Sequence, residues 1–226
     1  MTVDENLRRA RERLSEAATR AGRDPAEITL VAVSKMHSIE AIRGAARAGV
    51  IAFGENKVLE ANGKIAELGR ENLKWHLIGH LQSNKARKAV QLFHVIESLD
   101  SLELAQRLER ICIEEAREQL DVFVQVDLAD EDTKTGIAEK DLPPMIDFLK
   151  SCGRLKLVGL MTLPPYFDDP ESTRPFFIRL RELRDKLLPK DALSMGMSND
   201  FEVAIEEGAT HVRVGTAIFG KRPPRT

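Results

Sequence analysis

Short apolar segments alternate with amphipathic, helix-like segments along almost the whole chain. The predicted strands number eight, at residues 28–35, 50–56, 73–80, 93–99, 121–128, 155–163, 192–197 and 211–219. Apolar strands that alternate with helices form parallel sheets. Eight such units, with one extra helix in front of them, predict an α/β fold: a single (β/α)8 TIM barrel formed by residues 1–226. An open doubly wound sheet is the alternative, but no G-x-G-x-x-G motif follows any predicted strand.

The composition argues against several classes of protein. Of the 226 residues, 42% are hydrophobic and 31% are charged, which is enough for a sizeable core. The net charge of −2 argues against a general nucleic-acid binder, and no apolar run resembles a membrane span or a signal peptide. The two cysteines, Cys112 and Cys152, lack metal-ligand spacing. We therefore expect a cytoplasmic protein with no metal and with no nucleic-acid or membrane partner.

The first predicted strand, ITLVAVSK, ends in a lysine. A buried, unpaired ammonium is costly, so the Lys35 amine must face a cavity or water. Desolvation at the mouth of a barrel, or a nearby cation, would favour the neutral amine, which can form a Schiff base with an aldehyde. The alternative is a lysine that simply extends from the strand end into solvent.

Polar and glycine residues gather at the C-terminal ends of the predicted strands, where the active residues of a (β/α)8 barrel lie. The candidates among them are Lys35, Asn56, His76, Met195, Met197, Ser198, Arg213, Gly215 and Thr216. The two methionines fit barrel packing better than chemistry, although methionines at strand ends could also line a ligand.

Two of these clusters suit a phosphate group. In GMSND, Gly196 would permit close approach of the backbone, and Ser198 lies where the next helix begins. Gly215 and Thr216 repeat the arrangement after the eighth strand. Helix N-termini offer unpaired N–H groups to an anion, and the loops after strands seven and eight are the usual phosphate site of this fold. Taken singly, Ser198 could be only a helix cap and Gly215 only a turn.

Arg213 alternates with Val212 and Val214, so its side chain points away from those apolar neighbours. Facing the barrel mouth, it would place a permanent cation near the ring of a ligand. An aldehyde, a phosphate and a ring together describe pyridoxal 5′-phosphate (PLP). The alternative is an arginine paired with Glu206 or Glu207.

Several motifs are similar to those of the pyridoxal-phosphate homeostasis protein family. They are VAVSK, FGEN, WHLIGHLQSNK, LVGLMT, LSMGMSNDFEVAI and VRVGTAIFG, between residues 28 and 220. The family shares the barrel of the N-terminal domain of alanine racemase and lacks its second domain. The resemblance implies that Lys35 is the Schiff-base lysine and that Ser198, Gly215 and Thr216 contact the phosphate, with Met197 alongside. It also implies Arg213 at the pyridine nitrogen, Asn56 near the ring, and His76 and Met195 in the wall of the pocket.

The chain departs from the family pattern at three positions. Lys57 stands where many members have tyrosine, Leu59 where glutamine is common, and Ser38 where a proline often follows the lysine. These departures affect loops near the ring rather than the expected cofactor anchors.

Three functions fit these residues. The first is a PLP-binding protein of intracellular PLP homeostasis with little or no turnover, monomeric and able to serve PLP-dependent apo-enzymes. The second is an amino-acid racemase, which needs acid/base groups on both faces of the substrate; the chain has one tyrosine, Tyr166, and no second domain is expected. The third is a Schiff-base aldolase acting on a phosphosugar, in which a ring-facing Arg213 has no role. The first function is the best supported.

Overall fold

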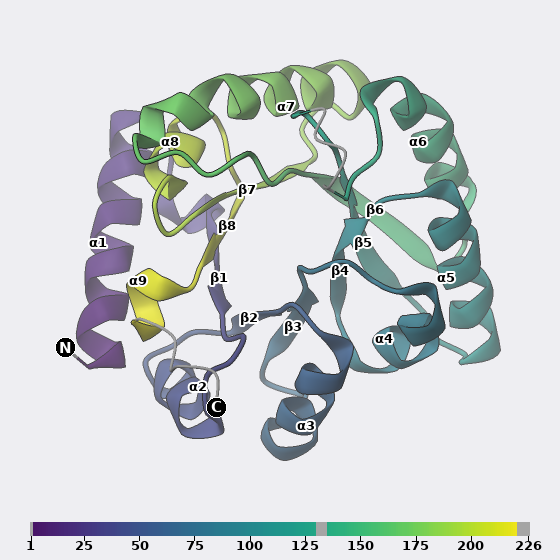
Figure 1. The fold of residues 1–226 in the computed structure, drawn as a ribbon, viewed down its shortest axis with the longest axis horizontal. Helices are drawn as coiled ribbons and strands as arrows, with labels where there is room; N and C mark the ends of the chain where they lie inside the picture. The colour runs from purple at the N-terminus through teal and green to yellow at the C-terminus, as the bar shows by residue number, and fades with distance from the viewer. Residues whose placement is uncertain (1, 130–134, 221–226) are drawn as a thin grey trace.

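The computed structural model of the chain describes residues 2–129 and 135–220. Eight parallel strands form a closed barrel in the order of the sequence, which confirms the predicted fold class. The strands are β1 Thr29–Val33, β2 Ala52–Glu55, β3 Lys74–Leu77, β4 Val95–Leu99, β5 Leu120–Gln125, β6 Leu155–Met161, β7 Ala192–Met197 and β8 His211–Val214. Figure 1 shows the ring of strands with the helices outside it.

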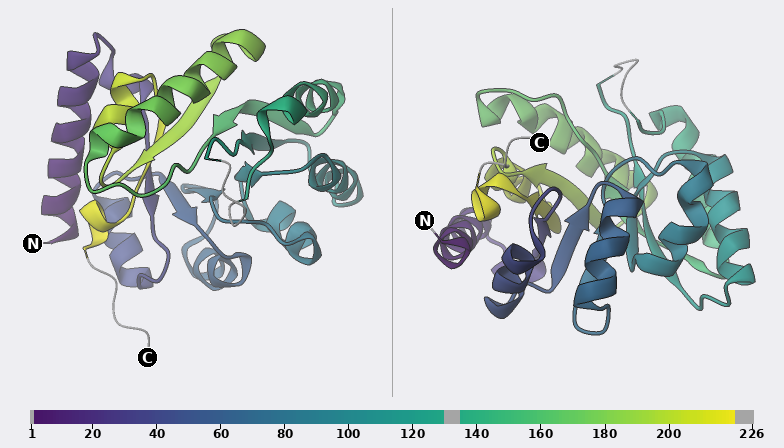
Figure 2. Two further views of the ribbon diagram at one scale, coloured as in Figure 1. Left: turned by 45° about the horizontal axis from the view of Figure 1, so that its top comes forward. Right: turned by 60° about the horizontal axis from the view of Figure 1, so that its bottom comes forward.

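Helices cover the outside of the barrel. They are α1 Val3–Arg20, α2 Ile39–Arg47, α3 Val58–Leu68, α4 Ala86–Leu92, α5 Leu102–Glu114, α6 Leu142–Ser151, α7 Arg174–Leu187, α8 Phe201–Glu206 and α9 Thr216–Phe219. Helix α1 is the predicted extra helix, and it packs beside α8 and α9 (Figure 2). Four short 3-10 helices lie in the connections, at Pro25–Glu27, Ser83–Lys85, Glu139–Asp141 and Pro170–Thr173.

Local side-chain bonds explain where several helices begin. The hydroxyl of Ser38 accepts the N–H of Ala41 at the start of α2, and that of Ser101 accepts the N–H of Leu104 at the start of α5. Each of these caps is worth about 1 kcal/mol. The Asp141 side chain, by contrast, makes no capping bond to α6.

Alternation along the strands, interrupted by register shifts in β4–β5, β5–β6 and β7–β8, separates two layers. Outward residues such as Phe53, Trp75 and Val212 join the large core between the strands and the helices. Inward residues include Val95, Phe123 and Met161, which form a separate small apolar cluster. The interior of the barrel is therefore packed rather than hollow over part of its length.

The first and last strands are shorter than predicted. Strand β1 ends at Val33, so Ser34 and Lys35 lie in the turn that follows it. Strand β8 ends at Val214, and residues 216–219 form the short helix α9 rather than the predicted continuation of the strand. The apolar sequence of α9 suits either structure, and the change of direction at Gly215 decides between them.

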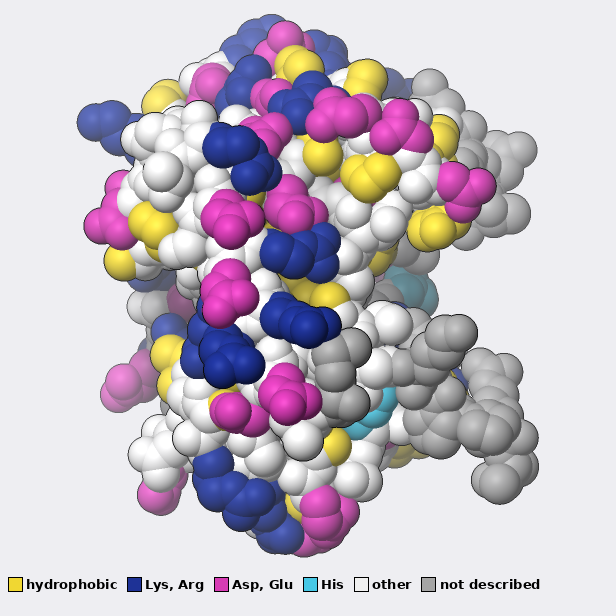
Figure 3. Space-filling view, turned by 90° about the vertical axis from the view of Figure 1, so that its left-hand side faces the viewer, with side chains coloured by type: hydrophobic (Ala, Val, Ile, Leu, Met, Phe, Trp, Pro, Cys, Tyr) yellow, Lys and Arg dark blue, Asp and Glu magenta, His cyan; other side chains and the backbone are white. Residues whose placement is uncertain are grey.

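The outer face of α1 carries basic and acidic side chains intermixed (Figure 3). Arg13 and Arg20 bind Glu202 and Glu206 of α8 through hydrogen-bonded ion pairs. The extra helix is thus held by ion pairs as well as by its apolar stripe. None of the helices in the described part of the chain is both long and apolar enough to span a membrane.

His94 is a half-buried histidine that should make folding pH-dependent. Its Nδ1 accepts the backbone N–H of Trp75 at 3.0 Å. Burial, together with the charges of Arg70 and Arg117, lowers the pKa of His94 to about 4. The neutral ring is therefore the form that the fold requires.

We expect the free energy of unfolding to fall as the pH decreases from about 6.5 towards 4, because unfolded His94 takes up a proton that folded His94 does not. His94→Asn should reduce this loss, since the asparagine oxygen can still accept the Trp75 N–H. Urea denaturation at pH 5 and pH 8 measures it, with the exposed His80→Asn as the control. An equal pH dependence in His94→Asn and the wild type would contradict the assignment.

Candidate functional site

The C-terminal end of the barrel opens into a cavity of about 820 Å³. Seven of the nine predicted site residues line it: Lys35, Asn56, Met197, Ser198, Arg213, Gly215 and Thr216. The other lining side chains come from the same strand ends and from the loop after β6, and they include Val33, Ile78, Leu163, Tyr166 and Phe167. Apolar walls with a few convergent polar groups are typical of a small-molecule site.

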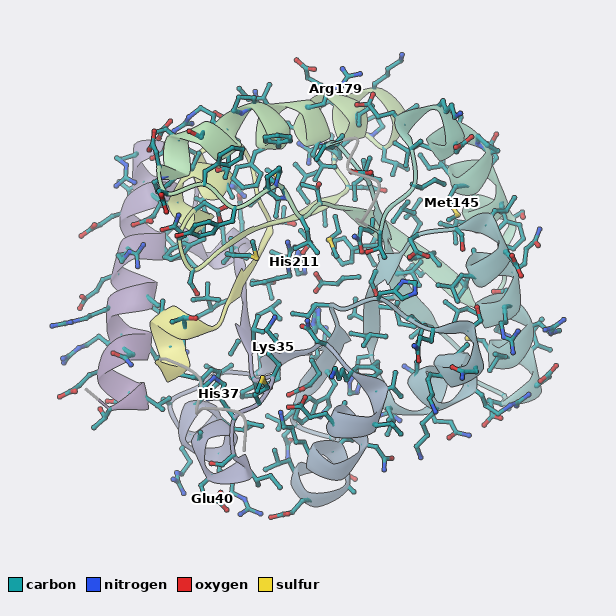
Figure 4. All side chains as sticks on the ribbon, in the orientation of Figure 1. Lys35, His37, Glu40, Met145, Arg179 and His211 are labelled. Carbon is teal, nitrogen blue, oxygen red and sulfur yellow. The ribbon has the colours of Figure 1, made fainter. Side chains whose placement is uncertain are left out.

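Lys35 enters this cavity from the turn after β1. Figure 4 shows it on the inner side of the ring of strands, with His37 beside it towards α2. The next residue, Met36, has φ of 63°, in the left-handed region that non-glycine residues seldom adopt. The turn therefore holds a conformation that needs support from its surroundings.

The predicted phosphate clusters do come together. The hydroxyl oxygen of Ser198 accepts the backbone N–H of Gly215 at 3.1 Å and that of Ala217 at 3.3 Å. A Cβ on Gly215 would lie 3.3 Å from Cβ of Val33, so only a small residue fits there comfortably. The loops after β7 and β8 thus present a hydroxyl and backbone N–H groups to one side of the cavity.

The structure requires glycine at position 196 for a different reason from the close backbone approach to a phosphate that the sequence suggested. Its φ is 91°, and an added Cβ would lie 2.5 Å from Cβ of Ala204 and 2.9 Å from Cα of Phe201. Gly196 is therefore needed for close packing of α8 on β7, and it does not line the cavity.

Arg213 reaches the floor of the cavity and is 2% exposed. Its Nη1 donates to Oγ of Ser194, and its Nη2 donates to the carbonyl oxygen of Thr162 at 2.8 Å. The alternative pairing with Glu206 or Glu207 is excluded, because those carboxylates bind Arg174.

The carboxylate that faces Arg213 belongs to Glu97, in the interior of the barrel. Oε2 of Glu97 lies 3.8 Å from Nη1 of Arg213 and accepts the Ser194 hydroxyl at 2.6 Å, while Oε1 contacts Nδ1 of His76 at 2.6 Å. Burial raises the pKa of Glu97, but the hydrogen bond with His76 and the charge of Arg213 outweigh burial and lower the pKa to about 2. Inside the barrel, these polar side chains thus form one connected network in which the charges of Glu97 and Arg213 neutralise each other.

Two predicted site residues do not line the cavity. His76 lies deeper in the barrel, beside Glu97 and at a ring-centroid distance of 6.3 Å from His211. Met195 is fully buried in the core outside the strands, because Ser194 and Arg213 occupy the inward positions. Asn56 does reach the cavity, and its backbone packs so closely on Gly79 that a Cβ there would lie 2.5 Å from the Asn56 oxygen.

Comparison with known proteins identifies the fold family. The family model for the alanine racemase N-terminal domain matches residues 5–223. A curated pyridoxal phosphate homeostasis protein of Pseudomonas aeruginosa is 46% identical over 98% of this chain and 96% of its own length. The chain belongs to the pyridoxal phosphate homeostasis protein family.

Solved structures agree with this membership. PipY of Synechococcus elongatus, whose structure was determined with PLP bound, has a TM-score of 0.83 and 40% identity, and the match covers 97% of this chain and 100% of PipY. Alanine racemase of Corynebacterium glutamicum has a TM-score of 0.71 at 18% identity; the match covers 98% of this chain but 60% of the racemase, and it shows only the shared fold.

The partners that hold the site residues of this family member were not predicted from the sequence. Glu97 and Ser194 are the clearest cases, since both are completely buried inside predicted strands. A signal was present: each is a polar side chain in a mostly apolar strand, and such a residue needs a partner when it is buried.

Glu97→Gln should destabilise the fold by about 3–5 kcal/mol at neutral pH, because it removes the carboxylate that forms an ion pair with the buried Arg213. Urea denaturation measures the loss, and Glu103→Gln on the outer face of α5 is the matched control. A loss no larger than that of the control would mean that Glu97 does not neutralise Arg213.

Proposed function

We propose that the protein binds PLP as a Schiff base on Lys35 and acts in intracellular PLP homeostasis with little or no turnover. The observation that carries the proposal is the convergence of three groups in one cavity: the amine-bearing Lys35, the Ser198–Gly215 loop pair, and the buried cation Arg213. The naming of the relatives and the PLP bound to PipY support the same ligand.

The residues present fit each part of PLP. The Ser198 hydroxyl, whose oxygen is held by the backbone N–H groups of Gly215 and Ala217, would face the phosphate together with Thr216. Arg213 would face the pyridine nitrogen, and Asn56 and Met197 would flank the ring. We infer that His76 influences the site indirectly, through its contact with Glu97 deeper in the barrel. Met195 only supports β7 from the core.

The covalent step needs only the lysine and the aldehyde. With PLP present, the neutral Lys35 amine would act as the nucleophile toward the aldehyde, and its two hydrogens would leave with the aldehyde oxygen as water. When bound, PLP would supply an electron sink, which a protonated pyridine nitrogen strengthens. A permanently charged Arg213 beside that nitrogen would keep it unprotonated and weaken the sink. The site is therefore suited to holding the cofactor.

The racemase alternative has weaker support from the cavity. Racemisation needs a second acid/base group opposite the lysine. Tyr166, the single tyrosine of the sequence, lines the cavity but is 75% exposed, so its phenol is not held in a fixed position. The cytoplasmic location, the monomeric state, the single-domain extent of residues 1–226 and the service to PLP-dependent apo-enzymes stay predictions.

Lys35→Ala should abolish the absorbance band at about 420 nm that appears when PLP forms an imine with the wild type. Lys57→Ala is the control. Lys57 is an exposed lysine that follows β2, and its side chain makes no capping bond to α3. Titration with PLP, followed by borohydride reduction and peptide mass spectrometry, locates the modified lysine. Absence of the band from the wild type would reject PLP binding, and the same band in Lys35→Ala would reject the assigned lysine.

We expect no measurable inversion of L-alanine or L-serine after long incubation with the PLP-loaded protein, because the phenol of Tyr166 is exposed at the cavity rather than fixed opposite the lysine. Chiral chromatography of the amino acids measures this, with an authentic alanine racemase as the positive control. Inversion that disappears in Lys35→Ala would replace the carrier function with a racemase.

A further inference from the structure

Side chains of helix α3, outside the barrel, form hydrogen bonds with the turn that carries Lys35. Nζ of Lys64 donates to the carbonyl oxygen of Ser34 at 2.7 Å, immediately before Lys35. Oε1 of Glu60 accepts the backbone N–H of Met36 at 2.5 Å, immediately after Lys35. Lys64 and Glu60 are joined at 2.6 Å. Both peptide groups that flank Lys35 are therefore tied to one ion pair.

A third member anchors this ion pair to the barrel wall. Glu55, at the end of β2, is completely buried, and its Oε1 accepts both Nζ of Lys64 at 2.7 Å and the hydroxyl of Ser34 at 2.6 Å. The Lys64 side chain is 8% exposed. The pKa of Glu60 is raised by burial, but its bonds to Lys64 and to the Met36 N–H outweigh burial and lower it, so the carboxylate stays charged.

This arrangement matches a need of the turn. Met36 adopts φ of 63°, which is unfavourable for a residue with a side chain. Charge-assisted hydrogen bonds on both sides can offset that cost, whereas a turn without them would relax to other conformations. Relaxation would move the Lys35 backbone, and with it the amine.

We propose that Glu60 and Lys64 are positioning residues, which hold the Ser34–Met36 turn in its left-handed conformation and thereby aim the Lys35 amine into the cavity. They lie outside the strands and do not line the cavity, so they act only through the backbone. The expected effect on imine formation rests on the proposed function. The stabilisation of the turn by Glu60 and Lys64 does not.

The test compares Glu60→Ala with two conservative variants and one control on the same helix. Glu60→Gln keeps an oxygen that can accept the Met36 N–H. Glu60→Asp keeps the charge beside Lys64, which protects the fold, but it is one methylene group too short to reach both partners. Glu67→Ala is the matched control, because Glu67 forms an exposed ion pair with Arg43 at 2.8 Å.

The first measurement needs no PLP: hydrogen exchange of the Met36 amide in the protein alone. We expect exchange to speed up by about tenfold or more in Glu60→Ala and Glu60→Asp, and to stay near the wild-type rate in Glu60→Gln and Glu67→Ala, since a lost charge-assisted bond frees the amide. Met36 exchange that is unchanged in both Glu60→Ala and Glu60→Asp would overturn the proposal.

The second measurement is the rate at which the band at about 420 nm grows after PLP is mixed with each variant. We expect Glu60→Ala and Glu60→Asp to slow it by about tenfold to a hundredfold, as a misplaced reacting group does. Adding Met36→Asn to Glu60→Ala should recover part of the rate, because asparagine tolerates the left-handed conformation.

The outcomes separate the two proposals. If the wild type shows no band, PLP binding is rejected. The exchange of the Met36 amide still tests whether Glu60 stabilises the turn. A normal band rate in Glu60→Ala with accelerated Met36 exchange shows that Glu60 stabilises the turn but does not aim Lys35, and it overturns the positioning role.

Discussion

A closed parallel barrel sends every second side chain of each strand into one narrow interior, and this alternation controls both the packing and the site. The inward residue nearest the C-terminal end of each strand must either fill the barrel or face the cavity. Arg213 reaches the cavity in this way from β8, and Lys35 and Asn56 reach it from the turns that follow β1 and β2, the next two strands of the closed ring. The polar groups converge because the strands close the ring, although the residues are far apart in the sequence.

This convergence requires charged side chains to be buried, and two ion pairs near the site neutralise such charges. Inside the barrel, Glu97 neutralises Arg213 through the Ser194 hydroxyl. On the outer side of β1 and β2, Lys64 neutralises the completely buried Glu55. Each partner replaces some of the hydrogen bonds that are lost on burial, although Oε2 of Glu55 and Nε2 of His76 are buried without a hydrogen-bond partner. Both networks end at a residue of the cavity or at the turn that carries one.

The sequence was sufficient for the fold and for the residues at the strand ends, because both depend on local patterns. Eight apolar segments predict the barrel, and the barrel implies that Lys35, Ser198 and Arg213 lie at the same end. The contact between Ser194 and Glu97 was not predictable in this way, since it spans 97 residues and depends on the register across the ring. Strand β8 was predicted too long for a related reason: residues 216–219 have the composition of a strand, and only the turn at Gly215 makes them a helix.

Holding a cofactor and using it make opposite demands on such a cavity. Catalysis of racemisation requires fixed groups on two sides and the exclusion of water, whereas reversible imine formation requires one aimed amine and access for water. Here one wall is rigid: the lysine turn is tied to α3, and Arg213 is fixed by three polar partners. The loops after β6, β7 and β8 carry the exposed side chains of Tyr166, Asn199 and Thr216 at the rim of the cavity. A site that is rigid around the amine and open at the rim favours capture and release over turnover.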